Sequence, residues 1–257
     1  MIHPTVLIDP DARIGENVSI GPYSVIGPHV VIGDGTWIGP HVVIKGPTTI
    51  GKSNRIFQFS SIGDDPQDKK YNNDSNSALE IGNHNVIREF CSINRGTDHG
   101  GGKTIVGDDN WIMAYVHIAH DCIVGNHTVF ANNTTLAGHV IVDDFTIFGG
   151  FTGVHQYCRI GKYCFTAIST VVVKDVPPFL MVSGNTAKPS GLNREGLKRH
   201  GFSSETINQL RSAYRIVYRQ GLTLNLALAE LEKFSAESNE VKYFSEFISG
   251  SSRGIVR

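Results

Sequence analysis

Apolar residues recur along this chain with a period of six. In the first 62 residues isoleucine occupies every sixth position and is often followed by glycine, as in IGENVS, IGPYSV and IGPHVV. Six is a multiple of the two-residue alternation of a strand, whereas on a 3.6-residue helix the same positions would rotate around the axis. The pattern therefore predicts short strands that end at Ile8, Ile14, Ile20, Ile26, Ile32, Ile38, Ile44, Ile50, Ile56 and Ile62.

The same period continues through most of the chain and predicts a solenoid. It resumes at Ile81, Ile87 and Ile93, and in a shifted register it runs from Val106 to Val172. Glycine, proline, asparagine and aspartate between the apolar positions supply corners, so each hexad is one strand and one turn. Three hexads close a coil of about 18 residues, because three sides return the chain to its starting direction. We expect a mainly β, triangular parallel solenoid over 1–190 whose isoleucines point inward.

The repeat, an aliphatic residue and glycine followed by four variable positions, resembles the hexapeptide repeat of the left-handed β-helix acyltransferases. The left hand comes from that resemblance, since the usual crossover rule would give a right-handed connection. Two polar, turn-rich segments interrupt the repeat, near 64–80 and 94–105. They are expected to project from the solenoid, and loops on a rigid scaffold commonly carry function.

A different pattern begins after the last hexad. Pro177 and Pro178 are expected to stop further strand pairing, because proline lacks the backbone donor. Apolar residues then follow helical spacing over 191–257, first in SSETINQLRSAYRIVYRQG and again in TLNLALAELEKFSA and NEVKYFSEFISG. This C-terminal α-helical region is expected either to cap the open end of the solenoid or to pack against a neighbouring subunit.

Composition narrows the function classes. A net charge of −1 and a pI near 6.8 argue against a nucleic-acid-binding protein. The N-terminal residues do not read as a secretion signal, and no apolar run is long enough to span a membrane, so we expect a cytoplasmic protein without stable membrane insertion. The four cysteines, with no CxxC pair, are interpreted as structural thiols.

Polar residues of possible chemical importance collect on one edge of the predicted prism. Division of residue numbers by 18 places five of them at neighbouring corner positions of three successive coils: His117, His120, His139, His155 and Gln156. The same count points Cys122 and Cys158 inward, into the core. A prism edge alone is a poor pocket, so we expect an adjacent subunit to complete it and the protein to be a homotrimer.

Several segments resemble one family, the UDP-N-acetylglucosamine O-acyltransferases that begin lipid A synthesis. The matching segments are HIAHDC (117–122), NNTTLAGHV (132–140), GGFTGVHQYCRIG (149–161), DVPP (175–178) and NREGLKRHGFS (193–203). The resemblance implies transfer of an (R)-3-hydroxyacyl group from acyl carrier protein to the glucosamine 3-hydroxyl of UDP-N-acetylglucosamine, without a metal or other cofactor. It covers the whole chain, including the helical tail.

The resemblance also implies roles for individual residues. His120 matches the general base, Asp121 a residue that orients it, and Gly138 a backbone donor for the oxyanion. Attack is direct, so Cys122 need not be a nucleophile. Substrate contacts are implied for Asp68, Lys70, His117, His139, His155 and Gln156, and, across a subunit boundary, for Asn193, Glu195 and Arg199.

The chain departs from the family pattern at a few positions. The segment after Tyr71 is longer than expected, and His200 and Thr186 replace an arginine and a histidine found in other members. Ile168 stands where long-chain enzymes of this kind have glycine. We therefore expect the acyl groove to be blocked distally and the preferred chain to be shorter, nearer ten to twelve carbons than fourteen.

Other functions use similar sequences. A zinc hydro-lyase of the γ-carbonic-anhydrase kind has a similar prism, and His117, His120 and His139 are candidate ligands for it. The N-acyltransferase of the same pathway is a nearer alternative, but it carries an additional N-terminal domain, whereas here the hexads begin at Ile8. A catalytically silent scaffold would leave the histidine edge unexplained.

Overall fold

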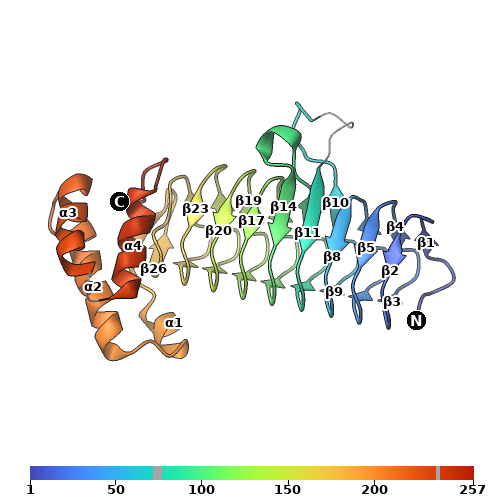
Figure 1. Cartoon of the computed structure of the whole chain (residues 1–257), viewed down its shortest axis with the longest axis horizontal. Coiled ribbons are helices and arrows are strands. Elements are labelled where there is room, and N and C mark those ends of the chain that lie inside the picture. The colour runs from blue at the N-terminus through green and yellow to red at the C-terminus, as the bar shows by residue number, and fades with distance from the viewer. Residues whose placement is uncertain (72–76, 236–237) are drawn as a thin grey trace.

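Three parallel sheets of very short strands form the three faces of a long prism in the computed structural model, and helices follow at one end (Figure 1). The structure describes residues 1–71, 77–235 and 238–257, without the side chains of residues 234 and 235. Leu7 pairs with Val25 and Val25 with Val43, so a coil of uninterrupted repeat advances by 18 residues. The coils from Ser61 to Ser92 and from Ser92 to His117 are longer, because they contain the two polar segments. The predicted parallel β-helix with a C-terminal helical region is therefore confirmed.

Up to β25, each sheet collects every third strand of the described chain. The first sheet contains β1 (Leu7–Ile8), β4 (Val25–Ile26), β7 (Val43–Ile44), β10 (Ser61–Asp64), β13 (Ser92–Asn94), β16 (His117–Ile118), β19 (Thr135–Leu136), β22 (Gly153–Val154) and β25 (Val171–Val172). The second contains β2 (Arg13–Ile14), β5 (Val30–Ile32), β8 (Thr48–Ile50), β11 (Ala78–Ile81), β14 (Lys103–Val106), β17 (Ile123–Val124), β20 (Ile141–Val142) and β23 (Arg159–Ile160).

The third sheet completes the prism and extends beyond the last hexad. It contains β3 (Ser19–Ile20), β6 (Trp37–Ile38), β9 (Arg55–Ile56), β12 (Val86–Ile87), β15 (Trp111–Ile112), β18 (Val129–Phe130), β21 (Ile147–Phe148), β24 (Phe165–Thr166), β26 (Leu180–Ser183) and β27 (Lys188–Leu192). The expectation that Pro177 and Pro178 end strand pairing was wrong. Both prolines precede β26, whose residues pair with β24 and with antiparallel β27 through their own backbone groups.

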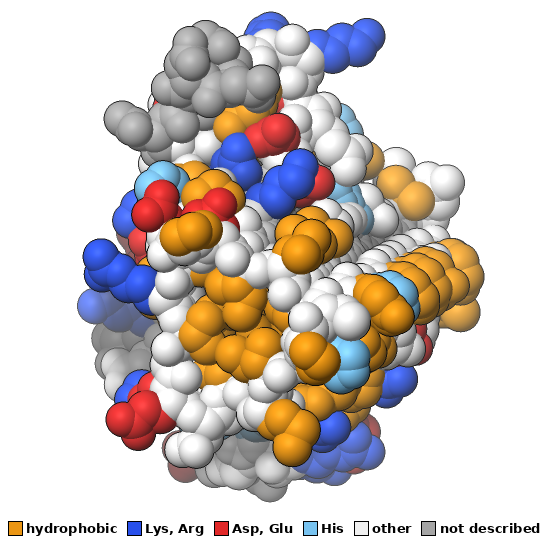
Figure 2. All heavy atoms as spheres, turned by 90° about the vertical axis from the view of Figure 1, so that its right-hand side faces the viewer, with side chains coloured by type: hydrophobic (Ala, Val, Ile, Leu, Met, Phe, Trp, Pro, Cys, Tyr) orange, Lys and Arg blue, Asp and Glu red, His pale blue; other side chains and the backbone are white. Residues whose placement is uncertain are grey.

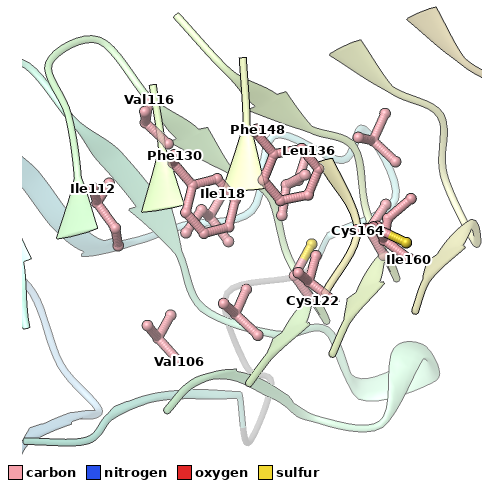
Figure 3. Close-up of a cluster of buried hydrophobic side chains, with 14 of the residues drawn as sticks. Val106, Ile112, Val116, Ile118, Cys122, Phe130, Leu136, Phe148, Ile160 and Cys164 are labelled. Carbon is pink, nitrogen blue, oxygen red and sulfur yellow. The ribbon is translucent and has the colours of Figure 1, made fainter. Parts of the chain in front are cut away.

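The interior is a stack of apolar side chains, as the period predicted. Ile38, Ile44 and Ile62 are fully buried, and further along Phe130 and Phe148 stack with their ring centroids 4.8 Å apart (Figure 3). All four cysteines are free and buried, and Cys122 and Cys164 lie among these apolar residues (Figure 3). Burial raises the pKa of the Cys122 thiol to about 12. The interpretation of the cysteines as core residues is confirmed.

Two edges of the prism differ in the groups that they carry. At one edge, which we call the loop edge, the chain passes from the first sheet to the second. The link from β10 to β11 at this edge is the first projecting loop (65–77), and the link from β13 to β14 is the second projecting loop (95–102). The second carries a short 3-10 helix, Asp98–Gly100. At the other, the aromatic edge, the chain passes from the third sheet to the first. Exposed rings stack there with centroids 4.9 to 5.2 Å apart: Tyr23, His41, Phe59, Phe90 and Tyr115.

The view along the prism from its N-terminal end shows apolar side chains gathered on the end face (Figure 2). A row of apolar side chains with histidine among them also runs back along one edge (Figure 2). Exposed apolar side chains in such rows are typical of surfaces that contact another protein.

The helical region covers the C-terminal end of its own prism (Figure 1). It consists of α1 (Arg194–Arg199), α2 (Ser204–Arg219), α3 (Leu224–Ser235) and α4 (Asn239–Ser249). Tyr243 of α4 donates a hydrogen bond of 2.5 Å to Asp143 on the prism, and the Arg159 guanidinium lies over the Phe247 ring. Of the two expectations for this region, the cap is confirmed. None of the described helices is long and apolar enough to cross a membrane.

Candidate active site

Topology brings the chemically important residues together on the loop edge. The two projecting loops, His120 after β16, His139 after β19 and Gln156 after β22 all lie where the chain turns from the first sheet to the second. A cavity of about 510 Å³ lies between them. Its walls include five of the predicted residues: Asp68, Lys70, His120, His139 and Gln156.

A buried carboxylate orients the central histidine. His120 Nδ1 lies 2.8 Å from Asp121 Oδ2. The side chain of Asp121 is only 1% exposed, and both of its oxygens accept from Thr97: the backbone N–H at 2.9 Å and the hydroxyl at 2.6 Å. Asp121 has φ of 59°, the left-handed corner conformation that short polar side chains tolerate. The corner therefore directs the carboxylate toward the imidazole.

These contacts determine the protonation of Asp121. Burial alone would raise the pKa of Asp121, but the hydrogen bonds from His120 and Thr97 outweigh it, so the pKa is lowered. The carboxylate is thus ionised at neutral pH and lies against His120 Nδ1, so that Nε2 is the ring nitrogen not paired with Asp121. Burial also lowers the pKa of the adjacent His139, although Asp121 opposes this effect.

Glycine is required on both sides of the pair. A Cβ on Gly138, one coil further on, would lie 2.5 Å from His120 Cε1. A Cβ on Gly100 of the second projecting loop would meet Asp121 Oδ2 at 2.1 Å and His139 Cε1 at 2.6 Å. The imidazole therefore packs directly on the backbone of Gly138. The Gly138 N–H donates no hydrogen bond to another described residue.

The first projecting loop forms the opposite wall. Asp68 Oδ1 accepts from the backbone N–H of Lys70 at 2.9 Å, and Asp68 Oδ2 lies 3.3 Å from His99 Nε2. The hydrogen bond from Lys70 is the main reason that the pKa of Asp68 is lowered, with burial opposing it. The expectation about the segment after Tyr71 falls partly on residues 72–76, which lie outside the described residues.

Sequence reasoning missed several residues of the site. Thr97, His99 and Gly100 belong to the second projecting loop. This loop lies outside the six-residue repeat, so its residues cannot be assigned positions on the prism by counting. Tyr157 also lines the cavity and stacks on His139, with centroids 4.3 Å apart. Its corner position follows that of Gln156, so the 18-residue count could have found it.

Two predicted histidines do not line this cavity in the single chain. His117, on β16, places Nδ1 at 2.7 Å from Ser92 Oγ, and burial lowers its pKa. His155 Nδ1 lies 3.2 Å from the Gln156 carbonyl oxygen and 3.4 Å from Arg253 Nη2. Their substrate contacts stay predictions.

The tail residues form a second, separate cavity. Asn193, Glu195 and Arg199 line about 450 Å³ together with apolar residues such as Phe165 and Met181, and the two cavities share no lining residue. Asn193 also begins α1, since its side chain accepts from Gly196 N at 3.2 Å. Glu195 pairs with Lys198 at 3.4 Å.

Ile168 lies on another edge than His120. It occupies the β24–β25 corner of the aromatic edge and is 70% exposed. Gly150 occupies the same corner one coil earlier, 18 positions before it. An isoleucine side chain therefore projects from the aromatic edge where the preceding coil has none.

The structure groups His120, Asp121 and His139 as the described residues able to hold a metal ion, with ligand atoms within 4.8 Å of one another. This set differs from the three histidines named for a zinc enzyme, because His117 bonds to Ser92 instead. A metal at Asp121 Oδ2 would have to replace the hydrogen bonds from His120 and Thr97.

The fold and the site define a hexapeptide-repeat acyltransferase. Residues 1–34 and 103–138 match the family model described as bacterial transferase hexapeptide, and residues 175–256 match domain 2 of UDP-N-acetylglucosamine O-acyltransferase.

Full-length relatives and solved structures agree. An acyl-(acyl-carrier-protein)–UDP-N-acetylglucosamine O-acyltransferase of Thiobacillus denitrificans is 58% identical over 100% of this chain and 99% of its own length. The UDP-N-acetylglucosamine acyltransferase structure of Francisella novicida superposes with a TM-score of 0.98 at 44% identity, covering 100% of this chain and 94% of that one. The Arabidopsis structure, at 38% identity and full coverage of both chains, gives 0.90. This chain belongs to the acyl-(acyl-carrier-protein)–UDP-N-acetylglucosamine O-acyltransferase family.

The lowered pKa of Asp121 predicts a pH-dependent contribution to stability. Below about pH 5 the unfolded chain begins to bind a proton at this carboxyl while the folded chain does not, so unfolding is favoured as pH falls toward the folded pKa. The stabilisation is fully present above this window. Asp121→Asn should destabilise the protein at pH 7 by about 1–3 kcal/mol, and the difference from wild type should shrink between about pH 5 and pH 3.

Urea unfolding of both proteins across this pH range measures the difference. A difference that stays constant with pH would contradict an ionised, hydrogen-bonded Asp121.

Proposed function

We propose that this chain transfers an (R)-3-hydroxyacyl group from acyl carrier protein to the glucosamine 3-hydroxyl of UDP-N-acetylglucosamine, the first step of lipid A biosynthesis. The names of its full-length relatives state the acyl donor and the acceptor. The observation that carries the proposal is the imidazole of His120, held through Nδ1 by a buried carboxylate at the wall of a cavity that also presents Lys70.

His120 is the general base of this reaction. Its Nε2 takes the proton of the sugar 3-hydroxyl while the hydroxyl oxygen attacks the thioester carbonyl carbon. The tetrahedral intermediate then collapses with cleavage of the C–S bond, and the imidazolium gives the proton to the departing thiolate sulfur, so that the carrier protein leaves as a thiol. Ionised Asp121 stabilises the imidazolium between the two steps.

Direct attack also agrees with the state of the cysteine nearest to the pair. Cys122 is fully buried, and burial raises its pKa to about 12, so it offers no thiolate for an acyl-enzyme. Gly138 supplies the oxyanion donor, since its N–H is unused within the described chain and lies next to His120.

The remaining groups of the cavity suit the acceptor. Lys70 presents a positive charge for the diphosphate, and Asp68 and Gln156 present hydrogen-bonding groups for the sugar. His139 and Tyr157 form a stacked pair at the wall. Asn193, Glu195 and Arg199 serve the nucleotide, but from a separate cavity in the single chain.

A homotrimer reconciles the two cavities. If the tail residues and His120 act on one substrate, the tail cavity of one subunit must face the loop edge of the next, as cyclic symmetry allows. Ile168 leads to the same arrangement, because it lies on the aromatic edge and can limit an acyl chain at His120 only across a subunit boundary. The exposed aromatic rings of that edge are a suitable contact surface.

Replacement of His120 tests the chemistry. His120→Ala should lower kcat for acyl transfer from 3-hydroxyacyl carrier protein to UDP-N-acetylglucosamine by about two or more orders of magnitude, while circular dichroism shows that the variant is still folded at the assay temperature. The exposed His3 provides the matched control, since His3→Ala should retain wild-type turnover.

The same preparations should be assayed for metal. Wild type freed of metal should keep its activity. If wild type transfers no acyl group and instead holds stoichiometric zinc that the variant loses, the protein is a metalloenzyme.

Mixed oligomers test the site shared between subunits. His120→Ala and Arg199→Ala proteins, each inactive alone, should regain activity when their subunits exchange, because about one quarter of the sites in a cyclic trimer then combine wild-type His120 and Arg199. Sedimentation should show a trimer. Monomers, or mixtures as inactive as the parents, would contradict a site built from two chains.

Substitution of Ile168 tests the acyl-length expectation. Wild type should prefer donors of ten to twelve carbons, since the isoleucine side chain projects into the path that glycine leaves open. Ile168→Gly should shift the preference toward fourteen carbons by about tenfold in relative kcat/KM. Turnover on donors of different lengths measures the shift, and an unchanged preference would refute the role of Ile168.

A further inference from the structure

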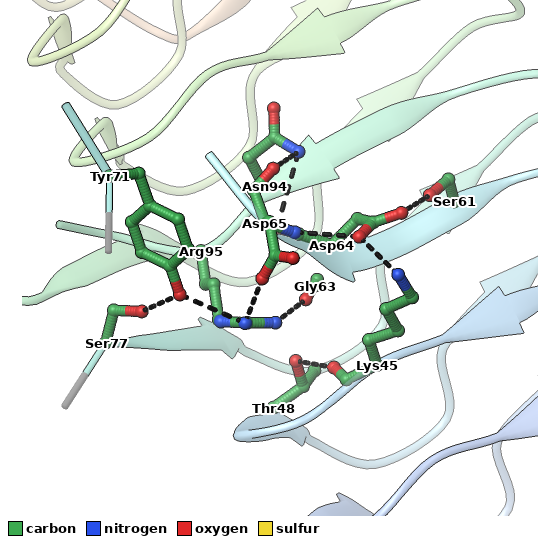
Figure 4. Close-up of polar contacts among 10 residues, drawn as sticks. All are labelled: Lys45, Thr48, Ser61, Gly63, Asp64, Asp65, Tyr71, Ser77, Asn94 and Arg95. Atoms are coloured by element: carbon green, nitrogen blue, oxygen red, sulfur yellow. Dashed lines mark hydrogen bonds and ion pairs between the residues drawn. The ribbon is translucent and has the colours of Figure 1, made fainter. Parts of the chain in front are cut away.

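The part of the first projecting loop that lines the cavity is held at both ends by one side chain. Gln67 to Lys70 face the cavity, while Asp65 before them and Tyr71 after them lie against the guanidinium of Arg95 (Figure 4). Arg95 itself belongs to the start of the second projecting loop. It is not a wall residue of either cavity formed by the predicted site residues.

Both terminal nitrogens of the guanidinium donate hydrogen bonds, whereas its buried Nε has no partner among the described residues. Nη1 donates to the Gly63 carbonyl oxygen at 2.7 Å, and Nη2 donates both to Asp65 Oδ1, as a close ion pair, and to Tyr71 Oη at 3.1 Å. The Arg95 side chain is 11% exposed and Asp65 is 43% exposed, so the guanidinium is shielded from water although its carboxylate partner is partly open to it. A planar fork with several fixed donors can satisfy such divergent acceptors together, which a lysine ammonium on a flexible stem does poorly.

A second ion pair, between Lys45 and Asp64, provides a comparison for the contacts of Arg95. Lys45 Nζ lies 2.7 Å from Asp64 Oδ1 at the foot of the same loop (Figure 4). Both side chains are substantially exposed, 50% and 36%, and exposed pairs contribute little to stability. Asp64 Oδ1 also accepts from the backbone N–H of Asp65 at 2.8 Å, so the Lys45 pair touches only the first residue of the segment from Asp65 to Tyr71.

The segment that carries Arg95 also contacts the catalytic pair. Two residues further on, Thr97 donates twice to Asp121, and His99 at the tip lies 3.3 Å from Asp68. One short stretch, 95–99, therefore touches both the carboxylate that orients His120 and the loop that carries Asp68 and Lys70. The distance between the two halves of the site is set by this stretch.

We propose that Arg95 is a positioning residue that holds Asp68 and Lys70 in register with the His120–Asp121 pair. It acts through Asp65 and Tyr71 and does not touch substrate. The inference rests on the proposed function, in which Asp68 and Lys70 bind UDP-N-acetylglucosamine. Loss of the clamp weakens acceptor binding more than it slows the chemical step.

Four variants separate positioning from general stability. Arg95→Met removes the guanidinium, Arg95→Lys keeps the charge without the fork, Tyr71→Phe removes one acceptor, and Lys45→Met is the matched control. Arg95→Met should raise the KM for UDP-N-acetylglucosamine by about tenfold or more while kcat falls less, and Arg95→Lys should be intermediate. Tyr71→Phe should show a smaller rise, and Lys45→Met should match wild type.

Limited trypsin digestion gives a readout that does not depend on activity. Cleavage after Lys69 and Lys70, followed by mass spectrometry, should be about tenfold faster in Arg95→Met than in wild type or Lys45→Met. Melting temperatures identify a variant that is merely destabilised. If Arg95→Met does not fold, Tyr71→Phe decides, since it leaves the guanidinium and its other contacts in place.

Several results would overturn the proposal. These are wild-type KM and cleavage in Arg95→Met, faster cleavage without a rise in KM, or a fall in melting temperature as the sole effect. If wild type itself transfers no acyl group, the proposed function fails, and cleavage rates still show whether Arg95 anchors the loop.

Discussion

The inward column of apolar side chains, one every six residues, is the constraint on which the rest of the structure depends. Because Ile38, Ile44 and Ile62 must all be buried, each hexad is obliged to make one face of the prism and turn. Removing one such side chain would cost about 2–5 kcal/mol, and the loss would occur in a stack where each coil is ordered by its neighbours. The same burial fixes where corners fall, so residues 18 apart lie one above the other wherever the repeat is uninterrupted. Functional side chains at a corner are therefore held in position by apolar packing inside the prism.

The site adds a second constraint, a buried negative charge. Asp121 is taken almost completely out of water and remains ionised because Thr97 and His120 donate to it. Such a charge is costly when any donor is missing. The second projecting loop is thus drawn onto the prism by the carboxylate, and Gly100 allows it to approach. Through His99 and Arg95 this loop then reaches the first one. The binding wall and the proposed base are in this way connected by hydrogen bonds, although they come from segments far apart in sequence.

The single chain explains only part of the proposed reaction. The cavity at His120 and the tail cavity at Arg199 have no common wall, and Ile168 occupies a third place on another edge. A rigid prism cannot bend to bring them together. Association of identical prisms can do so without any change in the fold, and the stacked rings of the aromatic edge offer an apolar surface for it.

The six-residue period by itself determined the fold class, the coil length, the inward cysteines and the edge that carries His120 and His139. These follow from the sequence because strand alternation and burial are local and periodic, so that a residue's number within the repeat gives its position on the prism. The helical cap was also readable from its apolar spacing. The two projecting loops have no period, and their contacts form between side chains brought together only by folding. Tertiary structure alone therefore decided that Thr97 holds Asp121, that His99 faces Asp68 and that Arg95 clamps the first loop. It also decided that β26 continues the third sheet after Pro177 and Pro178, which pair with no strand.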